Sequence, residues 1–196
     1  RTITVHAAGS YAVQQTINVN AATRPEGLAV ADLDGDGDSD LAAALSDDAF
    51  SLAATYLNNA GSLSTGPSAV TNGANSGDIV AADFDLDGDV DLVTANQDSN
   101  NISVVDNTGG AFAPGVTTGV GTRPERLLAA DLDNNGSPDL AVTNRDSNDT
   151  WIFLSEADNG GGDPMPCNAA DIAEPFGVLD LSDVSAFINA FTAGCP

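Results

Sequence analysis

The sequence predicts an all-β protein built from small antiparallel sheets, with a short helical appendage at its carboxy-terminal end. An aspartate-rich segment of ten residues occurs three times, beginning at Asp32, Asp83 and Asp131. Short apolar runs of strand type flank each copy, and turn-rich connectors separate further apolar runs. No convincing long helical period occurs before the appendage. Repetition, strand-type runs and the absence of helical periodicity together favour an all-β repeat protein.

The three copies belong to a longer repeating unit. They read DLDGDGDSDL, DFDLDGDVDL and DLDNNGSPDL, and their starts lie 51 and 48 residues apart. An RPE tripeptide at Arg24 and at Arg123 begins eight residues before a copy in both cases. With further candidate strands at 52–58, 102–107 and 150–155, each unit of about 50 residues holds about four short strands. This is the pattern of β-propeller blades, each made of four short antiparallel strands.

Composition narrows the possible classes of function. The 196 residues include 29 acidic and 5 basic side chains, for a formal net charge of −24, and 42% of the residues are hydrophobic. Binding to nucleic acid or to an anionic membrane surface needs a cationic footprint, so both are excluded. No apolar run approaches the length of a membrane span. The hydrophobic content indicates a folded protein despite the high charge.

The chemistry of the aspartate-rich loops points to a divalent cation. Carboxylates alternate at positions 1, 3, 5 and 9, and a glycine at position 6 permits a sharp turn with positive φ. Carboxylates that converge on one centre repel each other unless a cation neutralises them. An all-oxygen set without His or Cys favours Ca²⁺ over Zn²⁺ or Cu²⁺, and Mg²⁺ fits less well because it prefers a rigid octahedral shell. Solvated turns without metal are the alternative.

An EF-hand is the nearest related loop, and the sequence excludes it. An EF-hand needs a bidentate Glu at position 12 and a helix after it. Position 12 here is Ala43, Thr94 or Val142, each inside a strand-type run.

The D-x-D-x-[DN]-G-x-x-D-L loop between strands resembles the FG-GAP/VCBS repeats of integrin α-chains and secreted bacterial proteins, over roughly residues 9–156. The resemblance implies propeller blades and about three Ca²⁺ ions, each held by side chains at positions 1, 3, 5 and 9 and by the main-chain carbonyl at position 7. The implied ligands are Asp32, Asp34, Asp36 and Asp40 with the Asp38 carbonyl; Asp83, Asp85, Asp87 and Asp91 with the Asp89 carbonyl; and Asp131, Asp133, Asn135 and Asp139 with the Ser137 carbonyl. With Asn135 in place of a carboxylate, the third site is expected to be the weakest.

The predicted organisation has four parts. We expect residues 1–23 to supply strands that complete a blade, residues 24–156 to form the three repeats, residues 157–166 to be a Gly/Pro linker, and residues 167–196 to form a Cys-flanked tail.

The tail differs in character from the repeats. A Cys167–Cys195 disulfide is expected in an extracellular protein, with two free thiols as the alternative. Apolar residues between the cysteines recur at helical spacing, from Val184 to Phe191. The segment also resembles a degenerate half-dockerin, which implies a weak metal site at Asp171, Asp180 and Asp183.

Three loops are fewer than the four to eight blades of a closed propeller. Segment 9–19 resembles 110–120, the outer strand of a blade, whereas the third repeat lacks such a strand. The chain is therefore a subunit that completes a blade of its neighbour, a fragment of a longer protein, or an open monomer.

The predicted function follows from these alternatives. We expect an extracellular calcium-binding propeller protein with a structural, self-assembling role, whose partners are further copies in an oligomer or filament. The alternative is an adhesin, a glycan- or protein-binding module of a longer secreted protein. No catalytic motif occurs, so no enzyme is expected. Millimolar external calcium would fill such loops, which places the protein outside the cell or on its surface.

Overall fold

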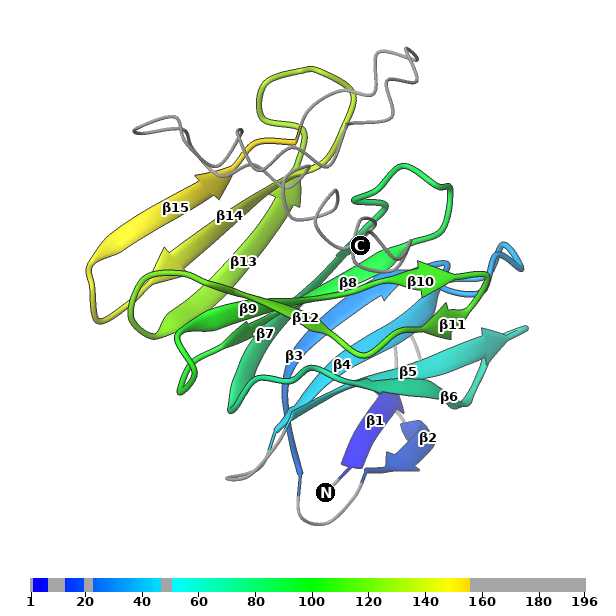
Figure 1. Ribbon diagram of the computed structural model, residues 1–196. Helices are drawn as coiled ribbons and strands as arrows, with labels where there is room; N and C mark the ends of the chain where they lie inside the picture. The colour runs from blue at the N-terminus through cyan, green and yellow to red at the C-terminus, as the bar shows by residue number, and fades with distance from the viewer. Residues whose placement is uncertain (1, 7–12, 20–22, 47–50, 156–196) are drawn as a thin grey trace, which may run out of the picture.

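The computed structural model describes residues 2–6, 13–19, 23–46 and 51–155, and every regular element in them is a β-strand (Figure 1). The all-β prediction is confirmed for this part of the chain. Within it, no helix is long and apolar enough to cross a membrane.

Several predictions fall on the rest of the chain. The tail helix, the Cys167–Cys195 disulfide and the weak metal site at Asp171, Asp180 and Asp183 all lie outside the described residues.

Three antiparallel sheets hold most of the strands, and each corresponds to one repeat. The first sheet has the order β3 (Arg24–Ala31), β4 (Asp40–Ser46), β5 (Ser51–Asn59), β6 (Ser62–Val70). The second has the order β7 (Ser76–Ala82), β8 (Asp91–Asn96), β9 (Asn101–Val105), β12 (Val116–Gly119). The third has the order β13 (Pro124–Ala130), β14 (Asp139–Asn144), β15 (Asp149–Phe153). A fourth strand is therefore present in the first two sheets, and the third sheet, which was expected to lack an outer strand, has three strands among the described residues.

Two short hairpins accompany the sheets. One pairs β10 (Asn107–Thr108) with β11 (Ala111–Phe112), and the other pairs β1 (Thr2–His6) with β2 (Val13–Asn18).

The sheets stack face to face, because both faces of their central strands are apolar. Successive side chains of a strand point to opposite faces. Leu92 of β8 accordingly packs in the core toward the first sheet, while its neighbour Val93 packs in the core toward the third. Strand β4 is almost entirely buried and carries three alanines in a row, residues 42–44. The small side chains of Ala42 and Ala44 face the second sheet and let the first two sheets approach closely, whereas Ala43 lies on the opposite face.

The inner strands β3, β7 and β13 lie side by side (Figure 1). A Cβ at Gly27 of β3 would lie 2.7 Å from the Cα of Asp78 in β7, so only glycine fits there. On the other side of β7, the Asp78 carboxylate accepts a hydrogen bond from the Leu127 amide of β13 at 3.0 Å, and it lies 4.0 Å from the Arg126 guanidinium. Backbone and side-chain contacts thus join all three sheets along their inner strands.

The β1–β2 hairpin covers the part of the remaining face of the first sheet that lies over β4, β5 and β6. Ile17 and Val19 pack against Leu45 and Tyr56 there. The Gln15 side chain bonds both main-chain groups of Leu63 in β6, accepting from the amide at 3.0 Å and donating to the carbonyl. Strand β2 therefore lies where a sheet preceding the first would lie, and it pairs with β1.

Candidate metal sites

Each aspartate-rich loop joins the first strand of a sheet to the second, and the three loops lie at the same end of the sheets (Figure 1). The predicted turn at position 6 is confirmed, since the three glycines there have φ of 92°, 99° and 94°: Gly37, Gly88, Gly136. Position 4 is also left-handed, with φ of 76°, 61° and 61°: Gly35, Leu86, Asn134. Two left-handed residues in each loop wrap the backbone around the side chains at positions 1, 3 and 5.

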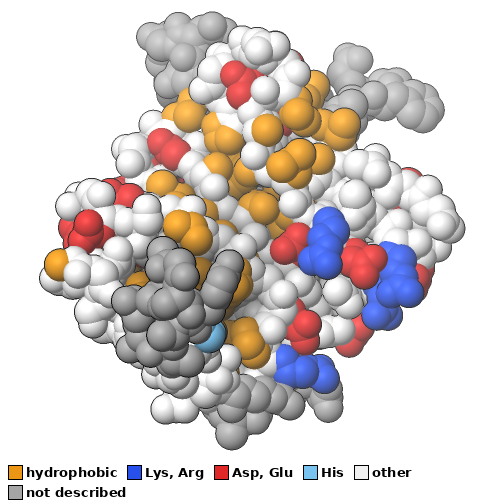
Figure 2. Space-filling model, turned by 180° about the vertical axis from the view of Figure 1, so that it is seen from behind, with side chains coloured by type: hydrophobic (Ala, Val, Ile, Leu, Met, Phe, Trp, Pro, Cys, Tyr) orange, Lys and Arg blue, Asp and Glu red, His pale blue; other side chains and the backbone are white. Residues whose placement is uncertain are grey.

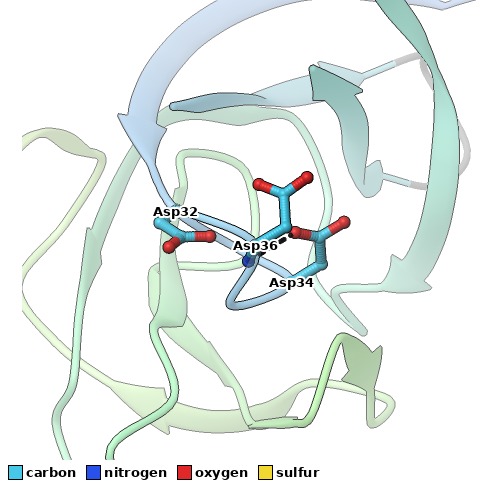
Figure 3. Close-up of side chains that lie close together, drawn as sticks. All are labelled: Asp32, Asp34 and Asp36. Carbon is cyan, nitrogen blue, oxygen red and sulfur yellow. Dashed lines mark hydrogen bonds between the residues drawn. The ribbon is translucent and has the colours of Figure 1, made fainter. Parts of the chain in front are cut away.

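A ladder of hydrogen bonds repeats in all three loops. The position 6 amide donates to the position 1 carboxylate, at 2.9 Å from Gly37 to Asp32, and at 3.0 Å in the other two loops. The position 5 amide donates to position 3, at 3.2 Å from Asp36 to Asp34; Figure 3 draws this bond as a dashed line. The position 7 amide donates to position 5 at 2.8 Å in each loop. The third of these bonds is accepted by the amide oxygen of Asn135, so asparagine serves the loop geometry as well as aspartate does.

The ladder brings carboxylates together. In each loop, three acidic side chains offer oxygen atoms that all lie within 4.8 Å of one another. The groups are Asp32, Asp34, Asp36; Asp83, Asp85, Asp91; and Asp131, Asp133, Asp139. Thus Asp40, which was predicted as a ligand, does not belong to the group in the first loop, and Asp87 does not belong to that in the second. Figure 3 shows the first group on the loop that follows β3.

The position 9 aspartates fasten the loops to the sheets. Asp40, Asp91 and Asp139 are 1%, 2% and 0% exposed. One carboxylate oxygen of each accepts the amide at position 2 of its own loop, and the other accepts an amide at or just beyond the end of the third strand. For Asp40 these donors are Leu33 at 2.9 Å and Asn58 at 2.7 Å. The oxygen that accepts the position 2 amide takes a single hydrogen bond in each loop and keeps a further lone pair, so this role is compatible with binding a cation.

The position 7 aspartate side chains accept backbone hydrogen bonds, a role that was not predicted from the sequence. Beyond the predicted carbonyl ligand, the Asp38 carboxylate accepts the Ala60 amide at 3.1 Å, and the Asp89 carboxylate accepts the Gly109 amide at 2.7 Å. Both amides belong to the turn after the third strand. In the third loop this position is Ser137, which is buried.

Two asparagines that were not among the predicted site residues complete these turns. The Asn58 side chain accepts the Gly61 amide, and the Asn107 side chain accepts the Gly110 amide, each at 2.9 Å. The Asn107 side chain also donates to the Leu33 carbonyl in the first loop at 3.0 Å, which links the second sheet to the first site. The shared Asn-x-x-Gly spacing in two repeats was the available signal.

The second loop provides the best test of whether a cation fits. The Oδ1 atom of Asp83 is buried and has no hydrogen-bond partner. Such an atom is costly unless something charged or polar meets it. Burial is the main cause that raises the pKa of Asp91 to about 7 and the pKa of Asp85 above its ordinary value, and neighbouring carboxylates add to it. Without a cation, this loop holds more negative charge than its surroundings stabilise.

Arginines do not neutralise the loops in the described part of the chain. The ion pairs found there join Arg24 to Glu26 at 3.5 Å, Arg126 to Asp78 and Arg145 to Glu125 at 3.7 Å. None of these acids lies in an aspartate-rich loop, and in Figure 2 arginine side chains lie beside acidic ones on one face of the molecule. The side chains gathered in each loop offer only oxygen ligands, so the residues present fit Ca²⁺.

Three stacked antiparallel sheets, each with one acidic loop of the same geometry, define a β-repeat protein. A family model for the FG-GAP-like repeat matches residues 32–94 and 83–142, together more than half of the chain. The chain belongs to the FG-GAP-like repeat family.

Other comparisons add little. No curated protein matches the chain. Among solved structures, the exotype rhamnogalacturonan lyase YesX is similar over 79% of this chain, with 16% sequence identity and a TM-score of 0.39. The chain spans 36% of the length of that lyase.

Proposed function

We propose that the protein is an extracellular calcium-binding β-propeller repeat protein with a structural, non-catalytic role, in which calcium fastens each blade and copies of the chain assemble head to tail. The observation that carries the calcium part is the recurrence of one hydrogen-bond ladder around three groups of carboxylates. Membership of the FG-GAP-like family supports it, since such repeats often bind Ca²⁺ and are typical of extracellular or surface proteins. Solvated turns would not need identical geometry in three places.

An exposed apolar row on the third sheet supports assembly. Leu128, Ala141 and Ile152 stand side by side across β13, β14 and β15. Leu128 is 57% exposed and Ile152 is 48% exposed.

The second sheet shows what normally covers this row. Its corresponding residues Val80, Val93 and Val104 pack in the core against the third sheet. The row on the third sheet is therefore suited to the same kind of partner, which is another sheet of this repeat.

A second copy of the chain offers such a sheet. On the face of its first sheet that points away from the second, Leu28 is 56% exposed and Val30 is 66% exposed. Strand β15 also pairs only with β14 among the described strands, so a strand of the neighbour, such as β2, can add to its edge. This contact is heterologous and yields rings or filaments. Because the net charge of −24 opposes association, bound calcium promotes it.

Sedimentation in millimolar calcium and in excess chelator tests the assembly. We expect particles larger than the 19.7 kDa chain in calcium and their dissociation in chelator. Leu128→Asp should abolish assembly, whereas Val70→Asp, which adds the same charge at a side chain 46% exposed elsewhere, should not. A wild-type monomer under both conditions overturns the assembly proposal, and saturable glycan or protein binding by that monomer would then favour the adhesin.

A further inference from the structure

Asp106 lies beside the second acidic loop, although it is not part of any loop motif. It follows β9, and the next residue, Asn107, donates its amide to Oδ1 of Asp91 at 2.9 Å. The Ala113 amide donates to the Asp106 carbonyl at 2.8 Å, so the backbone is held on both sides of this residue. The partly buried Asp106 side chain lies close enough to Asp85, Asp87 and Asp91 to interact with them electrostatically.

In the described part of the other two repeats, the equivalent position holds no carboxylate. Strand pairing aligns the residue before Asp106 with Tyr56 and Phe153, because Val105, Tyr56 and Phe153 each pair with the leucine after a position 9 aspartate. The residues equivalent to Asp106 are therefore Leu57 and Leu154. Among the described residues, the second loop thus has a carboxylate beside it at a position where the first and third loops have leucine.

The extra carboxylate lies where negative charge is already in excess. Asp83 has a buried, unpartnered Oδ1 in the same loop, and Asp91 is 2% exposed. Two ionised carboxyl groups in contact repel each other strongly at a partly buried site. A divalent cation between them turns that repulsion into a set of ligands, and the affinity of calcium sites rises with the number of charged ligands.

We propose that Asp106 is an additional ligand of the cation in the second loop, which makes this site the tightest of the three and the first to fill. The inference rests on the proposed calcium function and extends it, since it ranks the sites and assigns a ligand from outside the loop.

Calcium titration of the full chain by calorimetry, with a competing chelator, tests the ranking. We expect one tight site and two weaker ones in the wild type. Asp106→Asn should weaken the tight site by about tenfold or more and leave the others unchanged. Asp98→Asn is the matched control, because it removes the same charge from an exposed turn at the other end of the same sheet. Leu154→Asp should strengthen the third site, and it remains informative if Asp106→Asn fails to fold.

Thermal melting separates a ligand from a merely structural residue. In chelator, Asp106→Asn should melt higher than the wild type because the repulsion is relieved, whereas in calcium this advantage should vanish or reverse. A lower melting temperature by the same amount in both conditions overturns the inference, as does a wild-type calcium affinity in Asp106→Asn. If the wild type binds no calcium at all, the proposed function itself fails. Three bound ions with no effect of Asp106→Asn or Leu154→Asp refute only the role of Asp106.

Discussion

Asp40→Asn tests the position 9 aspartates as fasteners of the loops independently of calcium. The Asp40 carboxylate is 1% exposed and accepts two amides, from Leu33 at 2.9 Å and from Asn58 at 2.7 Å. Asparagine has the same shape, but one of its two terminal atoms is an NH₂ group that cannot accept a hydrogen bond. One buried amide therefore loses its acceptor and faces another donor.

The magnitude follows from that single lost bond. Leaving a buried donor unsatisfied costs about 1–3 kcal/mol, and hydrogen bonds to charged groups lie at the upper part of this range. We therefore expect the free energy of unfolding to fall by about 2–3 kcal/mol, a large part of the stability of an ordinary domain.

Urea unfolding in excess chelator, followed by circular dichroism and by the fluorescence of Trp151, measures this change without any contribution from bound calcium. Asp36→Asn in the same loop is the control, because its oxygen can still accept the Asp38 amide, as that of Asn135 does for Ser137. We expect the control to change stability by less than about 0.5 kcal/mol. Equal stability of Asp40→Asn and Asp36→Asn in chelator would refute the fastening role.

Three further predictions concern the packing of the sheets, the pH dependence of stability and the stabilisation of the fold by calcium. Gly27→Ala should destabilise the protein by about 1–3 kcal/mol, because its Cβ would meet the backbone of Asp78. Gly119→Ala is the control and should be tolerated, because a Cβ there would have nothing within 4 Å. Equal urea midpoints for the two variants would contradict the close approach of β3 and β7. Since the pKa of Asp91 is about 7 in the folded metal-free protein, the folded state binds more protons than the unfolded state between about pH 4 and pH 7. Stability in chelator should therefore fall as the pH rises from 5 to 7, and a rise over that window would oppose the assignment. Calcium at 100 times its dissociation constant should stabilise the protein by about 2.7 kcal/mol for each site, so identical melting curves in calcium and in chelator would exclude binding to the folded state.

Much of the fold was predictable because its signals are local and repeated. Alternating and fully apolar runs predicted the strands, and the spacing of the loops predicted one sheet for each repeat. The boundaries differ by a residue or two, as for the last strand, which was predicted at 150–155 and spans Asp149–Phe153. The glycines at position 6 have the positive φ that the motif requires.

The remaining features depend on contacts between distant parts of the chain. The sequence could not show that Asp40 and Asp91 hold the ends of the third strands, since their donors lie 16 to 18 residues away. Asp106 was not predicted as a site residue because it belongs to no repeated motif, and the equivalent positions in the other repeats hold Leu57 and Leu154. The packing of Ile17 and Val19 against Leu45 and Tyr56 of the first sheet likewise joins distant parts of the chain.

A crystal structure grown in calcium, with anomalous scattering measured at a wavelength where calcium contributes, tests the central claim most directly. We predict one anomalous peak in each of the three loops, about 2.3–2.6 Å from the carboxylate oxygens at positions 1 and 3. In the second loop, Oδ1 of Asp83 should be among the ligands. Loops that keep the same hydrogen-bond ladder in millimolar calcium and show no peak would contradict the claim.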